Sequence, residues 1–251
     1  LQGLAVDLQH FVEDEARLAS LVGVGFRGVV LNELVAYWLD SNTEIQSASR
    51  SMFQLALARM EQGQLDELCS QWQGLLSSAK TAAQIAKGRV ESSSSTPTTS
   101  SEEAELRTRA LALMGSIAVE RYTSLSPRTL KDIASTIHGA IVSDKGSEMR
   151  TPAELQMLGV AIELCRSGFA MWQHYFDAAE VVRSLFALST ANASSSSSSS
   201  NASSDGELRT LARAATLQIA AENTPLFMTT LSLDILHARS PTHCSATMRL
   251  V

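Results

Sequence analysis

Apolar residues recur every three or four positions along most of this 251-residue chain, which is the spacing of one face of an α-helix. Leu65, Leu68 and Trp72 belong to one such row, and Leu113 and Ile117 belong to another. Residues 106–118 carry two apolar rows, so we expect that helix to be buried on two sides. No stretch shows the alternation of apolar and polar residues that a half-buried strand needs. The sequence therefore predicts an all-α fold with no sheet.

Proline marks a helix start at three positions, where it directly follows Ser126, Thr151 or Thr224 and precedes an apolar stretch with helical spacing. An N-cap hydroxyl accepts a hydrogen bond from a backbone N–H of the first turn, and proline lacks an N–H that would stay unpaired there. We expect a helix to begin after each of these residues. The spacing of a reciprocal capping box occurs in two pairs, Thr151 with Glu154 and Asp177 with Glu180.

A weak internal repeat constrains how the helices associate. The hexapeptide LMGSIA at 113–118 resembles MLGVAI at 157–162, which sets Gly115 and Gly159 44 residues apart, and a third unit starts near Leu208. Stacked helix pairs need members that are apolar on two sides, because each pair is buried against the pair before it and the pair after it. The sequence therefore predicts an α-solenoid of antiparallel helix pairs, of the HEAT or armadillo type. A compact helical bundle is the alternative.

Two tracts interrupt this pattern, since 16 of the 35 serines fall in residues 92–101 and 189–204. Serine and threonine side chains bury little apolar surface, so burial cannot offset the conformational entropy that is lost when the backbone is ordered. We therefore expect both tracts to be disordered loops, with a phosphorylated regulatory loop as the functional alternative. We interpret residues 1–251 as one helical-repeat domain fragment with these parts: first helices in 1–88, a Ser/Thr-rich loop in 89–101, central repeats in 102–188, a Ser-rich loop in 189–206, a last repeat in 207–239 and a tail in 240–251.

Charge and hydropathy exclude several kinds of partner. The net charge is −6, and the 20 basic residues are scattered, which argues against nucleic-acid binding. The longest apolar stretch, residues 110–119, is about half of what a membrane crossing needs, so we expect no membrane insertion. Cys69, Cys165 and Cys244 are odd in number and far apart, which favours reduced thiols in a cytoplasmic protein. Because the chain opens at Leu1 without a Met, we expect it to be part of a longer protein.

Three motifs that could carry chemistry are weak. Gly23, Gly25 and Gly28 have the glycine spacing of a dinucleotide-binding turn, but a charged, helix-like segment precedes them where that turn needs a strand. Ser77 and Lys80 have the spacing of some acyl-transfer enzymes but lack the companion motifs of those enzymes. The third motif is a tail cluster, formed by His237, His243 and Cys244, which lacks the second cysteine pair of a zinc site. We predict no catalytic, cofactor-binding or metal-binding residue, and no small-molecule substrate.

The most individual segment is RSGFAMWQHYFD at 166–177, which lies between two apolar helical stretches. We expect Gly168 to end the first helix, Phe169, Trp172 and Tyr175 to pack the corner, and Asp177 to cap the next helix. This arrangement resembles the C-terminal helical region of the beta-type rabconnectin family of WD-repeat proteins. Residues 110–118, 211–236 and 45–53 are similar to neighbouring parts of that region. Gly168, Phe169, Trp172 and Asp177 are fold markers of the resemblance and are not assigned to a binding site.

The resemblance implies a non-catalytic scaffold at the cytoplasmic surface of endomembranes such as vesicles, vacuoles and endosomes. Beta-type rabconnectin acts with an alpha-type partner to promote assembly of the vacuolar proton-pumping ATPase and organelle acidification. An alpha-type rabconnectin and subunits of that pump are therefore the implied partners. Two alternatives stay open: a generic α-solenoid adaptor in another membrane-trafficking complex, and, more remotely, a dinucleotide-binding enzyme that uses Gly23 to Gly28.

Overall fold

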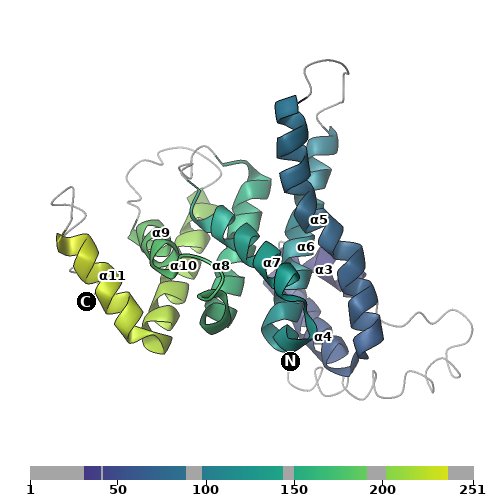
Figure 1. The fold of residues 1–251 in the computed structure, drawn as a ribbon, viewed down its shortest axis with the longest axis horizontal. Helices are drawn as coiled ribbons and strands as arrows, with labels where there is room; N and C mark the ends of the chain where they lie inside the picture. The colour runs from purple at the N-terminus through teal and green to yellow at the C-terminus, as the bar shows by residue number, and fades with distance from the viewer. Residues whose placement is uncertain (1–30, 41, 89–97, 144–149, 191–201, 237–251) are drawn as a thin grey trace, which may run out of the picture. The chain divides into compact units, whose positions relative to one another are not determined.

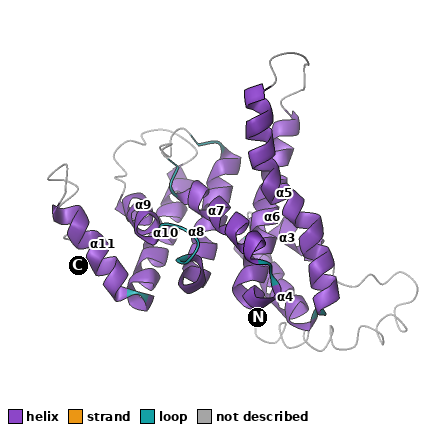
Figure 2. Cartoon of the chain, in the orientation of Figure 1, coloured by secondary structure: helices purple, strands orange, loops and turns teal. Residues whose placement is uncertain are grey.

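The computed structural model describes residues 31–40, 42–88, 98–143, 150–190 and 202–236. All regular structure in these ranges is helical and no strand is found, which confirms the all-α prediction for the described part of the chain (Figure 2). The elements are α3 (Leu31–Ala36), the short 3-10 helix η1 (Tyr37–Leu39), α4 (Thr43–Arg59), α5 (Gln62–Gly88), α6 (Thr98–Arg121), the 3-10 helix η2 (Tyr122–Ser124), α7 (Pro127–Ile141), α8 (Pro152–Trp172), α9 (Ala178–Thr190), α10 (Ala202–Glu222) and α11 (Thr224–Leu236).

The chain divides into two compact units, and the boundary falls inside α5, between Gln71 and Trp72. In the first unit α3 packs against α4. Helix η1 also contacts α4, where Trp38 of η1 and Phe53 of α4 meet edge to face with ring centroids 5.1 Å apart, and both are buried. The buried hydroxyl of Ser49 donates to the carbonyl of Leu34, so this polar group is satisfied inside the interface. A single repeat domain over 1–251 stays a prediction.

In the second unit, helices that alternate along the chain lie against one another (Figure 1). Helix α8 contacts α6 on one side and α10 on the other, while α9 contacts α7 and α11. The even-numbered helices also contact the odd-numbered ones: α6 contacts α7, α7 contacts α8, α9 contacts α10, and α10 contacts α11. The helices of this unit therefore form two rows, one of α6, α8 and α10 and one of α7, α9 and α11.

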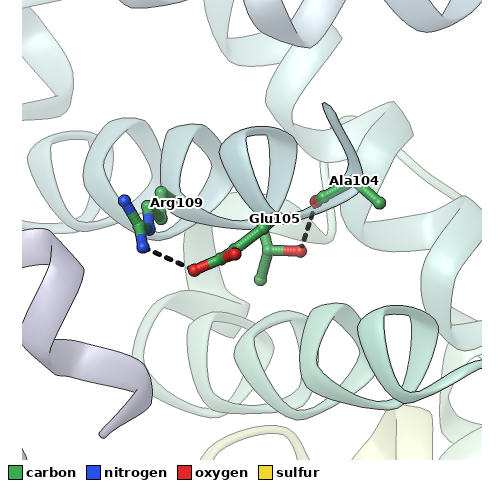
Figure 3. A network of polar contacts seen from close by, with 4 residues as sticks. Ala104, Glu105 and Arg109 are labelled. Carbon is green, nitrogen blue, oxygen red and sulfur yellow. Dashed lines mark hydrogen bonds and ion pairs between the residues drawn. The ribbon is translucent and has the colours of Figure 1, made fainter. Parts of the chain in front are cut away.

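Helix α6 is buried on more than one side, as its two apolar rows predict. Five consecutive residues, from Ala110 to Met114, have no exposed surface, which requires neighbours around the whole circumference of the helix. Nearer its start, the buried hydroxyl of Thr108 donates to the carbonyl of Ala104 at 3.0 Å (Figure 3). On the exposed side of the same turn, Arg109 pairs with Glu105 one turn back.

The two glycines of the internal repeat occupy corresponding places in the first row. A Cβ on Gly115 of α6 would lie 2.8 Å from Cδ2 of Leu164 on α8. A Cβ on Gly159 of α8 would lie 3.6 Å from Cδ2 of Leu208 on α10. Each glycine therefore lies on the side that its helix turns toward the next helix of the row, one repeat further along the chain.

The predicted helix starts are confirmed at Ser126 and Thr151, whose side chains accept from backbone N–H groups. Thr151 and Glu154 form the complete capping box, with Thr151 N donating to Glu154 Oε2 at 2.8 Å. The expectation for Thr224 is wrong by one residue. Asn223 caps α11 by accepting from Leu226 N at 3.2 Å, while the hydroxyl of Thr224 donates back to α10, because a threonine just after a helix can reach the carbonyl four residues earlier.

The two Ser-rich loops lie largely outside the described residues, which omit 89–97 and 191–201. Their boundaries differ from the predicted ones, since α6 begins at Thr98, α9 continues to Thr190 and α10 begins at Ala202. At the end of α9 the hydroxyls of Ser189 and Thr190 donate to the carbonyl of Phe186, so these residues belong to the last turn of that helix. Where α6 and α10 begin, hydroxyl and carboxylate residues suit the first turn of a helix, in which N–H groups lack helical partners. Of the helices in the described ranges, none combines the length and apolar character that crossing a membrane requires.

Candidate functional site

A cleft of about 340 Å³ opens between α6, α7 and α8, within the range of small-ligand sites. Its lining combines cationic, hydroxyl and apolar groups: Leu76, Arg107, Ser135, Thr136, Gly139, Ala140, Ser143, Arg150, Glu154 and Met157. Arg150 donates to the carbonyl oxygen of Ala140 in the last turn of α7 at 3.5 Å, and to that of Ser143 just past the helix at 3.3 Å. Burial lowers the pKa of Arg150, and the nearby carboxylate of Glu154 opposes that effect.

The polar groups of this cleft mostly serve helix ends. The carboxylate of Glu154 accepts from both the backbone N–H and the hydroxyl of Thr151, at 2.8 and 3.2 Å. The hydroxyl of Thr136 donates to the carbonyl of Asp132 at 2.9 Å. Arg150 satisfies carbonyls in and just after the last turn of α7, where a cation is favoured by the helix dipole. The polar contacts of Arg150 and Glu154 are therefore accounted for by two helix termini.

The segment that carries the fold markers forms the corner between α8 and α9. Phe169 and Trp172 are buried, and the Trp172 indole Nε1 donates to the carbonyl of Leu164 at 3.0 Å. A Cβ on Gly168 would lie 2.8 Å from Val119 Cγ2 and 2.9 Å from Trp172 Nε1. Gly168 is needed here because both α6 and the indole approach it closely.

Two details of that corner differ from the sequence prediction. Gly168 ends the regular helix, with φ −132° and ψ 25°, but helical geometry resumes after this kink and α8 continues to Trp172. The indole N–H satisfies a carbonyl one turn before the kink, and Gln173 N bonds back to Phe169 O. Phe176, which the prediction did not use, has its ring centroid 6.4 Å from that of Phe169, and Tyr175 and Phe176 are both half-buried.

Asp177 caps α9 as predicted, since its Oδ1 accepts from Glu180 N at 3.0 Å. The reciprocal half of that capping box is replaced by a longer-range contact. The carboxylate of Glu180 lies 3.0 Å from Nε2 of His138 on α7, whose ring also contacts Phe176. Glu180 therefore joins the two helices instead of closing its own first turn.

Further polar contacts join helices that lie in the same row. Arg166 donates to Gln218 at 3.0 Å, between α8 and α10. Arg183 donates to Asp234 at 2.8 Å, between α9 and α11. The two partners of these contacts lie 52 and 51 residues apart in sequence, so no local pattern could have identified them.

An exposed apolar surface, which we call the end face, lies on α10 and α11, the last described helix of each row. It contains four side chains with large exposed fractions: Leu217 (49%), Met228 (42%), Leu233 (44%) and Leu236 (77%). The sequence analysis did not identify this surface, because helical spacing does not show which side of the last helix stays uncovered. The signal that could have found it is composition, since Asp234 is the one charged residue in the thirteen residues of α11.

The remaining motifs are placed as follows. Two motifs lie outside the described residues: the glycine motif of Gly23, Gly25 and Gly28, and the tail cluster of His237, His243 and Cys244. The third motif, Ser77 with Lys80, lies on α5 at positions whose side chains are not described. Cys165 and Cys69 are buried thiols. Burial raises the pKa of Cys165 to about 12, and burial together with Asp66 raises that of Cys69 to about 11. Among the described side chains, no three His, Cys, Asp or Glu converge as metal ligands would.

Comparisons with known proteins add no relative. No family model, no curated protein and no solved structure matches this chain.

Proposed function

We propose that this chain is a non-catalytic protein-interaction scaffold, built as an α-solenoid of antiparallel helix pairs of the HEAT or armadillo type. The observation that carries the proposal is the arrangement of the second unit in two rows, with Gly115 and Gly159 at corresponding places one repeat apart. In a solenoid each pair is buried only by its neighbours, which accounts for helices that are apolar on two sides. Such stacks offer extended surfaces that suit binding of other proteins.

The partners we propose are those that the resemblance implies. The segment around Gly168, Phe169, Trp172 and Asp177 is similar to the C-terminal helical region of beta-type rabconnectin, and all four residues have definite structural roles at the corner of α8 and α9. On this proposal the parent protein acts with an alpha-type rabconnectin in assembly of the vacuolar proton-pumping ATPase, at the cytoplasmic surface of endomembranes. The helical stack supplies partner surface and carries no chemistry.

Affinity purification of the tagged parent protein at its native level, followed by mass spectrometry, tests this. We expect an alpha-type rabconnectin or vacuolar ATPase subunits to co-purify. A Gly115→Leu variant should lose them, because a side chain there collides with Leu164, whereas Gly139→Leu should keep them, since nothing lies within 4 Å of a Cβ on Gly139. Recovery of a different trafficking complex would support a generic adaptor, and a clean preparation that contains neither partner would refute the assignment.

A further inference from the structure

The end face lies where a further helix pair of the stack would be placed. On α10, Leu208 faces Gly159 and Gln218 bonds to Arg166, so both side chains point toward α8. Leu217 follows Arg209 and Arg213 at intervals of four residues, so these three form one row along α10. Because successive residues of a helix are rotated by about 100°, this row lies on the side of α10 opposite to the side that faces α8.

Helix α11 shows the same relation to α9. Asp234 bonds to Arg183 of α9, and this contact fixes the inner side of the helix. Met228, Ser232 and Leu236 are spaced by four residues and lie on the opposite side, where all three are exposed. Since the single charged residue of α11 is turned inward, the outer side of the helix is uncharged along its whole length. An uncharged exposed side with large apolar residues is characteristic of an interaction surface.

The charges beside the apolar residues are cationic. Arg213 is exposed, and neither it nor Arg209 has an ion pair or hydrogen bond to any other described side chain. We propose that the end face binds an amphipathic helix of a partner protein, with an aliphatic stripe that covers Leu217, Met228 and Leu236 and carboxylates at its border that pair with the two arginines. This inference rests on the proposed scaffold function and names the surface and the chemistry of the partner.

A second copy of the chain fits this surface less well. Thirteen helical residues span about 20 Å, and two adjacent helices, each about 10 Å wide, together span about 20 Å. The patch therefore covers on the order of 400 Å², about half of what each side of a stable dimer needs. Pairing two end faces would also bring two pairs of arginines into one interface, which costs free energy through like-charge repulsion. A helix that supplies carboxylates removes this cost.

The test uses the full 251-residue chain and two designed probes. Each probe is an 18-residue fluorescein-labelled helical peptide with leucines on one side, and the stripe is bordered by glutamates in the first peptide and by lysines in the second. Fluorescence anisotropy at low ionic strength should show saturable binding of the glutamate peptide. Leu236→Glu and Met228→Glu should each weaken that binding by about tenfold or more, as expected for central apolar contacts. The matched control is Leu106→Glu, which alters a leucine that is 41% exposed on α6 and should leave binding unchanged.

Charge reversal at Arg213 provides the specific readout. Arg213→Glu should weaken binding of the glutamate peptide and strengthen that of the lysine peptide, an exchange that loss of folding cannot produce. The proposal is overturned by absence of saturable binding, by equal effects of Leu106→Glu and Leu236→Glu, or by indifference to the charge exchange. It is also overturned if sedimentation shows a dimer that Leu236→Glu dissociates, or if binding needs removal of residues 237–251. If peptide binding fails while the parent protein retains its partners, the end face is wrong and the scaffold function stands.

Discussion

Replacing Gly115 by alanine tests the close approach of α6 and α8 directly. Alanine in a helix is favoured over glycine by about 1 kcal/mol, so the substitution alone should stabilise α6. The added Cβ, however, lies within 2.8 Å of Leu164 Cδ2 and closer still to its Cδ1, and Leu164 is buried. Forcing an extra methyl group into a packed core costs about 1–3 kcal/mol, so the collision offsets or exceeds the gain in propensity.

Gly139→Ala is the matched control, because Gly139 lies on the exposed side of α7 and a Cβ at this position would have nothing within 4 Å. It keeps the gain in propensity without the collision. We therefore expect Gly115→Ala to be less stable than Gly139→Ala by about 1–3 kcal/mol. In a domain of this size that difference corresponds to a separation of roughly 2–12 °C in Tm, measurable by circular dichroism at 222 nm.

Leu164→Ala completes a double-mutant cycle. The single change removes buried methyl groups and costs about 2–5 kcal/mol, but it also removes the atoms that meet the new Cβ. The double variant should therefore be more stable than the sum of the two single effects predicts, with a coupling of about 1–3 kcal/mol. Gly115→Ala variants that are as stable as Gly139→Ala, or effects that add without coupling, would refute the close contact between the two helices.

Three further predictions concern the second unit. Trp172→Phe removes the indole N–H that satisfies the buried carbonyl of Leu164, so we expect a loss of about 1–3 kcal/mol in urea denaturation. Thr151→Ala removes the N-cap of α8 and one half of its capping box with Glu154, so it should cost about 1 kcal/mol in the same assay; no change would contradict the cap. Because burial raises the pKa of Cys165 to about 12, its thiol should resist iodoacetamide at pH 8 in the folded chain and react in urea, as read by peptide mass spectrometry. The same shift makes folding less favourable as pH rises from about 9 toward 12, since only the unfolded chain then carries the thiolate.

Local signals in the sequence were sufficient to place the starts of α7 and α8. The caps at Ser126 and Thr151 depend on a hydroxyl and its own first turn, so three or four residues hold the whole signal. The two apolar rows of α6 predict its burial for the same reason, because helical spacing fixes which side chains share a side. The error at Thr224 is also local: Asn223 is an equally good cap one residue earlier, and the proline signal does not distinguish them.

What the sequence could not predict depends on the neighbour that each side chain meets. Gly168 breaks the regular helix as glycine predicts, yet the chain resumes helical geometry after it, and an indole four residues later supplies the hydrogen bond that the carbonyl of Leu164 accepts. Glu180 has the spacing of a capping box, yet its carboxylate lies against His138, 42 residues earlier. The end face was missed for a related reason, since an apolar helix is recognisable in sequence but the side of it that stays uncovered is not.

The two glycines of the internal repeat show what similarity between repeats can predict about structure and what it cannot. LMGSIA and MLGVAI place Gly115 and Gly159 at corresponding positions, but the space around them differs: Leu164 excludes a Cβ at the first site, whereas Leu208 meets a Cβ at the second in ordinary van der Waals contact. Both leucines come from the following repeat, so the constraint on each glycine is set by residues outside its own repeat. Similarity between repeats therefore predicts where a glycine lies, while its tolerance of a side chain is decided one repeat later. On this reasoning Gly159→Ala should gain helix propensity with little penalty and should resemble Gly139→Ala in stability more than Gly115→Ala.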